Sequence, residues 1–108
     1  MTSPSSADRL RPYEKITAWQ LSHKLFLAVH RMTRGWPKRE WYGLAAQVRR
    51  AAFSIPANIV EGQSKRGVRE YRRFLDIARG SLAELQYALR AAHELGYITD
   101  SDRPPRPT

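Results

Sequence analysis

The stretch that decides the fold is residues 49–62, which reads Arg-Arg-Ala-Ala-Phe-Ser-Ile-Pro-Ala-Asn-Ile-Val-Glu-Gly. Its apolar spacing predicts the second half of a helix that continues past Pro56. A proline inside a helix removes one backbone hydrogen bond and crowds the carbonyl of Ala52, four residues back, at a cost of roughly 3 kcal/mol. Such a proline persists where packing fixes the kink. We therefore expect a buried, kinked helix with Gly62 as its C′ residue.

Two polar residues, Asn58 and Glu61, follow the proline on this apolar run. Residues three apart share one helix face, and a buried carboxylate needs hydrogen-bond donors. We expect Asn58, or an arginine such as Arg79, to donate to Glu61 within a buried structural network. A ligand site at Asn58 and Glu61 is the alternative.

The segment before this stretch predicts a first helix. Thr17 and Gln20 match a capping box at its start, and Gly35 follows its end near residue 34. The second helix is expected to begin after Pro37 and to run to Glu61. The main apolar stripe of the first helix recurs about every 3.6 residues: Ala18, Leu21, Leu25, Ala28, Val29 and Met32.

Both helices also carry a second apolar patch, away from the main stripe. Trp19 and Phe26 form it on the first helix, and Tyr42 and Phe53 form it on the second. This is more apolar surface than a monomer needs, and large exposed apolar patches usually mark interfaces. We therefore expect these four residues to be oligomer contacts in a self-associating protein.

The third helix is expected from about Val68 to Leu95, with Gly96 closing it. Gly80 and Ser81 lie in its middle, where glycine costs about 1 kcal/mol relative to alanine. Close approach of another helix is the expected compensation, which gives Gly80 a structural role. No strand-like alternation of any length occurs, so the sequence predicts an all-α protein.

The chain of 108 residues fits one domain. Residues 1–13 are rich in Ser and Pro and are expected to be a disordered tail. Residues 14–98 form the helical bundle domain, and residues 99–108 form a Pro-rich tail that cannot be helical. The longest apolar run, residues 25–29, is far shorter than the roughly 20 residues that span a membrane. With no signal peptide and no cysteine, a cytoplasmic location without membrane attachment is expected.

The charge of the chain favours a polyanionic partner. Lys and Arg total 19 against 10 Asp and Glu, for a formal net charge of +9, and most of the cations are arginine. Arginine binds phosphate in a bidentate manner and stacks on bases. A basic surface that serves solubility alone is the alternative. The cations that we expect to bind nucleic acid lie on the second and third helices: Arg49, Arg50, Lys65, Arg66, Arg69, Arg72, Arg73 and Arg79.

No convincing catalytic or metal-binding motif occurs in the chain. No glutamate has a histidine three residues later, so the di-iron signature of helix bundles is absent. His93 and Glu94 resemble the start of a zinc-protease motif, but Tyr97 stands where its second histidine belongs. No phosphate-binding glycine loop is present. We expect no enzyme activity, no cofactor and no metal.

Two motifs together resemble a known family. They are Ser-Ile-Pro-Ala-Asn-Ile at residues 54–59 and Ala-Arg-Gly-Ser-Leu-Ala-Glu-Leu at residues 78–85. With Trp36-Pro37 and residues 49–52, they resemble the 23S ribosomal-RNA intervening-sequence proteins, also called the four-helix-bundle protein family. The likeness spans about residues 14 to 98.

The resemblance implies an antiparallel, up-down four-helix bundle and a homo-oligomeric ring of five subunits. Members include the accessory protein of diversity-generating retroelements, which binds nucleic acid and a reverse transcriptase. The present chain departs from the family after Ile98, where a fourth helix is expected. Pro104, Pro105 and Pro107 forbid such a helix, so the fourth helix is expected to be truncated.

These observations predict a non-enzymatic protein that binds RNA or DNA. The alternative is a self-assembling adaptor that binds a reverse transcriptase or another protein partner.

Overall fold

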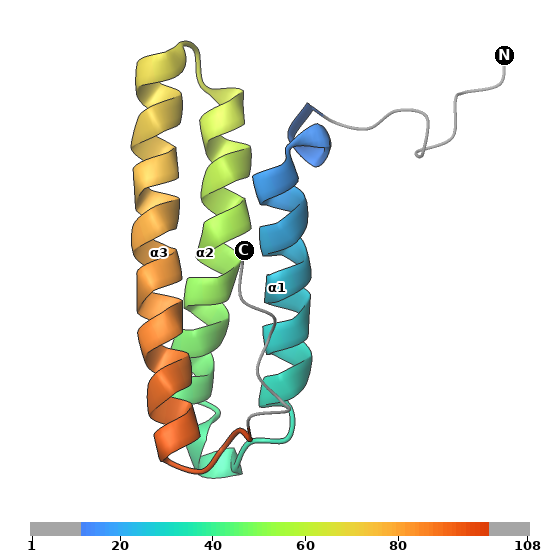
Figure 1. The fold of residues 1–108 in the computed structure, drawn as a ribbon, viewed down its shortest axis with the longest axis vertical. Helices are drawn as coiled ribbons and strands as arrows, with labels where there is room; N and C mark the ends of the chain where they lie inside the picture. Colours follow the sequence, from blue (N-terminus) through green and yellow to red (C-terminus); the bar gives the residue numbers. More distant parts are fainter. Residues whose placement is uncertain (1–11, 100–108) are drawn as a thin grey trace, which may run out of the picture.

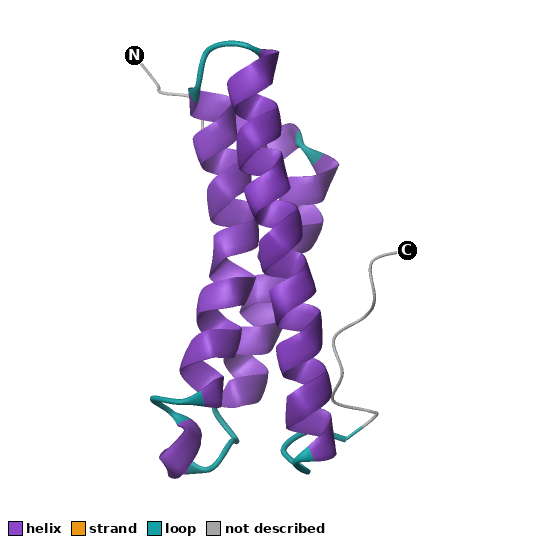
Figure 2. Ribbon diagram, turned by 90° about the vertical axis from the view of Figure 1, so that its left-hand side faces the viewer, coloured by secondary structure: helices purple, strands orange, loops and turns teal. Residues whose placement is uncertain are grey.

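The computed structural model describes residues 12–99 of the chain. Three long helices lie side by side and alternate in direction, with α2 between α1 and α3 (Figure 1, Figure 2). Two short 3₁₀ helices precede α1 and α2. The elements are η1 (Pro12–Lys15), α1 (Thr17–Thr33), η2 (Lys38–Glu40), α2 (Leu44–Ser64) and α3 (Val68–Glu94). The described residues contain no strand, which confirms the all-α class. The expected fourth-helix truncation falls on residues 100–108, outside the described part.

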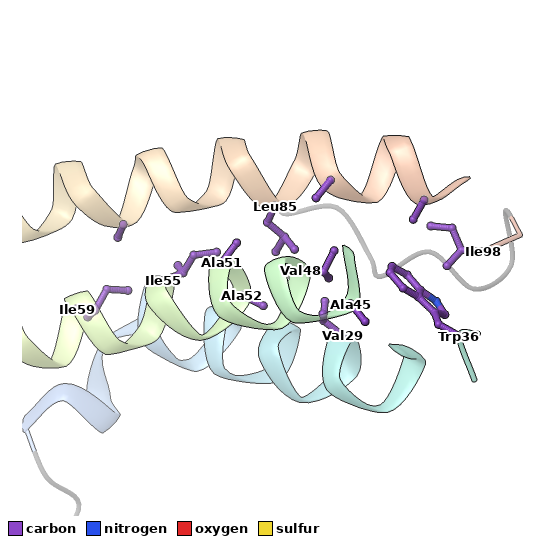
Figure 3. Packing of buried hydrophobic residues seen from close by; sticks show 13 residues of the cluster. Val29, Trp36, Ala45, Val48, Ala51, Ala52, Ile55, Ile59, Leu85 and Ile98 are labelled. Atoms are coloured by element: carbon purple, nitrogen blue, oxygen red, sulfur yellow. The ribbon is translucent and has the colours of Figure 1, made fainter. Parts of the chain in front are cut away.

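The core of the molecule is built on α2, which contacts both of its neighbours. Figure 3 shows Leu85 of α3 and Val29 of α1 approaching α2 from different sides. Small side chains at the contacts let the helices come close together. The buried residues of α2 are Ala45, Val48, Ala51, Ala52, Ile55, Pro56, Ile59 and Gly62.

The face that α1 buries differs from the one that its leucines predict. Ser22, Val29 and Thr33 are buried, whereas Leu21 is 55% exposed. The hydroxyls of Ser22 and Thr33 each donate to the carbonyl three residues earlier, at 3.1 and 3.0 Å. Their burial therefore leaves no donor unpaired. The predicted stripe is wrong in phase, because Val29 is its one fully buried member.

Pro56 is buried inside α2, and the helix continues past it as predicted. The prediction that Gly62 is a C′ residue is wrong. Gly62 lies within the helix, which ends at Ser64, and its φ is not positive. A Cβ atom at Gly62 would lie 3.0 Å from Cβ of Phe74. The glycine therefore serves the close approach of α3, and the positive φ occurs at Gly67, the N-cap residue of α3, where φ is 88°.

The end of α3 agrees with the sequence. Gly96 has a φ of 82°, which a residue without Cβ adopts without strain. Its N–H donates to the carbonyl of His93 at 3.0 Å, and the N–H of Tyr97 donates to that of Ala92 at 2.9 Å. These two bonds form a Schellman motif.

The start of α1 lacks the predicted capping box. Ile16 is the N-cap residue, and no side chain caps the helix. Thr17 therefore lies inside the first turn. The side-chain amide of Gln20 donates instead to the carbonyl of Glu14 at 2.8 Å, which ties α1 to η1.

The predicted disordered tail over residues 1–13 is wrong at its last two residues. Pro12 and Tyr13 belong to η1, and the Tyr13 ring packs edge-on against Trp19 with centroids 5.0 Å apart. Residues 1–11 lie outside the described part.

A hydrogen bond joins the segment after α3 to the loop between α1 and α2. The Tyr97 hydroxyl donates to Oε2 of Glu40 at 2.6 Å, and the Tyr97 ring lies 5.7 Å from the buried Trp36 ring. The bond to Glu40, together with burial, raises the pKa of Tyr97 above its usual 10.0. Since a raised pKa favours the protonated phenol in the folded state, this link stabilises the fold below pH 10 and is lost as Tyr97 ionises at higher pH.

The close helix approach predicted at Gly80 is not found among the described residues. A Cβ at Gly80 would meet no atom within 4 Å. Its neighbour Ser81 makes the contact with α2 instead, since its Oγ lies 2.7 Å from Oγ of Ser54. Gly62, not Gly80, is the glycine that the α2–α3 contact requires.

We predict opposite effects for alanine at these two glycines. Gly62→Ala places a methyl group against Phe74, so we expect the free energy of unfolding to fall by about 1–3 kcal/mol, the usual cost of overpacking. Gly80→Ala fills open space and improves helix propensity, so we expect a gain of up to about 1 kcal/mol. Urea denaturation measures both values. A Gly62→Ala variant as stable as the parent would contradict the close packing.

Candidate nucleic-acid interface

Helix α3 has one buried face and one strongly basic face. Its buried residues are Phe74, Ala78, Leu85, Ala88 and Ala92. The basic residues predicted near its start are all exposed, as expected for a binding surface. We call them the basic cluster: Lys65, Arg66, Arg69, Arg72, Arg73 and Arg79. The cluster begins in the α2–α3 connection and continues along the solvent side of α3.

Two cations of the cluster are held over an aromatic ring. The Arg73 guanidinium carbon lies 4.5 Å from the ring centroid of Phe74, and Nζ of Lys65 lies 5.7 Å from it. Arg73 also pairs with Glu70 at 3.4 Å, and Lys65 pairs with Glu61 at 3.9 Å. These contacts orient both cations, while their side chains stay 58% and 41% exposed.

The other cations of the cluster have little compensation. Arg79 pairs with Asp76 at 3.8 Å, but both side chains are at least 75% exposed, and such pairs contribute only about 0–1 kcal/mol. Within residues 12–99, Arg66, Arg69 and Arg72 form no ion pair with a carboxylate. The centre of the cluster therefore carries uncompensated positive charge.

Arg49 and Arg50 do not join this cluster. Nε of Arg49 donates to Oγ1 of Thr33 at 2.7 Å, so its side chain links α2 to the end of α1. Arg50 is exposed, but it is more than three helical turns from Gly62, or about 18 Å along the axis. These two cations lie apart from the start of the cluster, and Arg79 is the outlying member that extends the cluster along α3.

A shallow, open depression lies beside the cluster, and sequence reasoning missed it. Its volume is about 380 Å³, and it is lined by Gly62, Gln63, Lys65, Gly67, Val68 and Tyr71. Its shape depends on the positive φ of Gly67 and on how closely α3 approaches Gly62. Neither feature has a signal in the spacing of the residues.

The predicted network between Asn58 and Glu61 does not form. Glu61 is 57% exposed, and its ion-pair partner is Lys65, not Arg79. Asn58 instead donates to the carbonyl of Ser54 at 2.7 Å and to its Oγ at 2.9 Å. The Ser54 hydroxyl also contacts that of Ser81. The polar network is therefore real, but it joins α2 to α3 through serines.

The four predicted oligomer contacts differ in their surroundings. Phe26 and Phe53 pack against each other across α1 and α2, with centroids 5.5 Å apart, although Phe53 stays 56% exposed. Trp19 is half-buried and stacks on His23. Tyr42 lies in the turn before α2 and is 96% exposed. Phe53 and Tyr42 therefore remain available to a partner.

A family model described as 23S rRNA-intervening sequence protein matches residues 14–103. The chain belongs to this family. The match covers the whole described bundle, including α3 and the basic cluster, and it confirms the resemblance. No curated protein matches the chain.

Two further properties of this family member bear on its chemistry. No helix in residues 12–99 combines the length and the hydrophobicity needed to cross a bilayer. The same residues contain no group of three or more His, Asp or Glu side chains placed to hold a metal ion.

We predict that Asn58 and Glu61 differ in their effect on stability. Asn58→Ala removes two hydrogen bonds and leaves the Ser54 hydroxyl less well paired, so we expect a loss of about 1–2 kcal/mol in unfolding free energy. Glu61→Ala removes one exposed ion pair and should change it by no more than about 0.5 kcal/mol. Denaturant titration of both variants decides this. A larger loss for Glu61→Ala would restore the buried-carboxylate interpretation.

Proposed function

We propose that this protein is a non-enzymatic nucleic-acid-binding protein and that the basic cluster is its binding surface. The observation that carries the proposal is that the exposed Arg66, Arg69 and Arg72 pair with no carboxylate of residues 12–99. A face that serves solubility alone usually mixes both signs of charge. Here the segment from Lys65 to Arg73 holds five cations and the single anion Glu70.

RNA is the first ligand to test, because the family is named after an intervening sequence of 23S ribosomal RNA. Arginines that project from one face of a helix reach phosphates without reading base edges. We therefore expect binding with weak sequence preference, driven by the release of counterions. A cytoplasmic location stays a prediction from the sequence.

We predict a strong dependence of binding on salt. If about four cations of the cluster contact phosphate, the log–log slope of affinity against salt should be near −3 to −4. Changing Arg69, Arg72 and Arg73 together to Ala should reduce its magnitude by about 2 to 3. The helix should stay folded, because alanine is the best helix former. Fluorescence anisotropy with single-stranded RNA and DNA between low and moderate salt measures the slope.

The matched control changes Lys24, Arg31 and Arg50 together to Ala. These exposed cations lie on α1 and on α2, away from the cluster, and they remove the same net charge. We expect this variant to change the slope by less than about 1. Equal effects of the two triple variants would mean that net charge alone drives binding, and absence of binding at low salt would remove the proposal.

We also propose that the protein self-associates. The supporting observation is the exposure of large apolar side chains along one end and one side of the bundle, with Tyr42 at 96%, Phe53 at 56% and Ile77 at 41%. An oligomer would repeat the basic cluster and raise the apparent affinity for a long polyanion. A ring of five subunits is the assembly that the family resemblance implies.

We predict that the purified chain sediments as an oligomer at micromolar concentration. Phe53→Lys should shift it toward the monomer, because a charge in a buried interface is costly. Val68→Lys is the matched control, since Val68 is 67% exposed at the start of α3, the opposite end of the bundle from Tyr42. Circular dichroism verifies that both variants remain helical. A clean, folded monomer of the parent chain would refute self-association.

A further inference from the structure

The bundle has a second face that is apolar and is distinct from the basic cluster. On α1, Leu21, Leu25 and Met32 fall on one side of the buried Val29, at about 100° per residue. Leu21 is 55% exposed, and Leu25 and Met32 are half-buried. Since α1 buries Ser22 and Thr33 against α2, these longer side chains are left at the edge of the contact.

Helix α3 contributes a matching stripe. Leu75, Leu82 and Leu89 recur at seven-residue intervals and are half-buried beside the core. The buried residues of α3 separate these leucines from Ser81, which contacts Ser54 of α2. We call the six residues of the two stripes the leucine face: Leu21, Leu25, Met32, Leu75, Leu82 and Leu89.

The two stripes lie on the same side of α2. The opposite side of α2 carries two other contacts, Ser54 with Ser81 of α3 and Phe53 with Phe26 of α1. The leucine face lies across the seam from both contacts. Helix α2 separates α1 from α3 (Figure 1), and no further helix within residues 12–99 covers the face.

Cations border the leucine face on both outer edges. On α1 they are Lys24 and Arg31, both exposed, and α1 contains no acidic residue at all. On α3 they are Arg72, Arg79 and Arg90. Arg79 and Arg90 pair with Asp76 and Glu94 at 3.8 and 3.4 Å. These side chains are all at least 64% exposed, so the pairs compensate the charge weakly.

We propose that the leucine face binds an amphipathic helix of a partner protein whose apolar stripe is flanked by acidic residues. An apolar stripe bordered by cations on both sides is complementary to such a helix in hydrophobicity and in charge. The stripe from Leu21 to Met32 is about 17 Å long, and that from Leu75 to Leu89 about 21 Å, which fits a helix of about 12–16 residues.

Two other occupants fit the face less well. A second copy of this chain would bring the same cationic borders to the contact, and like charges placed opposite each other are unfavourable. A nucleic-acid backbone is compatible with the borders but offers no apolar groups for Leu82 and its neighbours. Burial of these leucines contributes about 25 cal/mol per Å² to binding when the occupant is apolar.

The test uses two labelled synthetic helical peptides of about 16 residues. Both carry the same leucine stripe, flanked in one by glutamates and in the other by lysines. We expect the glutamate peptide to bind the full chain at least about tenfold more tightly than the lysine peptide in fluorescence anisotropy. Leu21→Gln should weaken binding of the glutamate peptide. Since Leu21 is 55% exposed, the variant should fold normally.

Lys24→Glu and Arg50→Glu form the matched pair of charge variants. Each reverses one exposed cation in mid-helix, but Lys24 borders the leucine face and Arg50 does not. We expect Lys24→Glu to weaken binding of the glutamate peptide several-fold more than Arg50→Glu does. Neither residue belongs to the basic cluster, so this result is independent of the nucleic-acid measurement.

Four results would overturn the proposal. Equal binding of the two peptides would mean that the contact is nonspecific hydrophobic binding. Equal effects of Lys24→Glu and Arg50→Glu would mean that net charge alone attracts the peptide. A change in sedimentation caused by Leu21→Gln would assign the face to a second copy of the chain. A loss of oligonucleotide binding in Leu21→Gln as large as its loss of glutamate-peptide binding would assign the face to nucleic acid.

Discussion

The close packing of α2 between two neighbours is the constraint on which the rest of the structure depends. One face of helix α2 is buried along its length, and half of the buried residues are alanine or glycine. At Gly62 the backbone lies so near Phe74 that even a methyl group would be crowded. Because small residues cannot shift to fill a gap, this contact fixes the position of α3 relative to α2 along the helix axis. Pro56 is tolerated in the same helix because tertiary packing surrounds it on the buried side.

A central α2 leaves the outer helices with much exposed surface. Each of α1 and α3 buries only the seam that faces α2, so most of its circumference stays in contact with solvent or with a partner. On α3 the outward side is charged, and the three ion pairs that Arg73, Arg79 and Arg90 form within residues 12–99 all join residues three or four apart on exposed turns. Such pairs are weak and local, so they do not neutralise the face as a whole. The excess of cations therefore remains a property of the surface, whatever its role.

The sequence predicts well what depends on local chemistry. The three long helices, the passage of α2 through Pro56 and the Schellman motif at Gly96 all follow from spacing and from single residues. The errors arise where a contact between distant segments decides the role of a residue. Gly62 serves a neighbouring helix and not a cap, and Arg49 turns to Thr33 of α1. On α1 the buried seam includes two hydroxyls that bond to their own helix, so a pattern that counts serine and threonine as polar places the seam on the leucines instead.

The basic cluster was predictable as a set of exposed cations, but its boundaries were not. Helical spacing placed Arg69, Arg72 and Arg73 on the outer side of α3, whereas only the fold could separate Arg50 from them. The fold also reveals that Arg72 and Arg79, two members of the basic cluster, border the leucine face as well. An anion bound on either surface lowers the positive potential that the other surface uses. By linkage, the two proposed ligands should then weaken each other, and this coupling is electrostatic, so it should fade as salt screens it over the roughly 8–10 Å of a physiological Debye length.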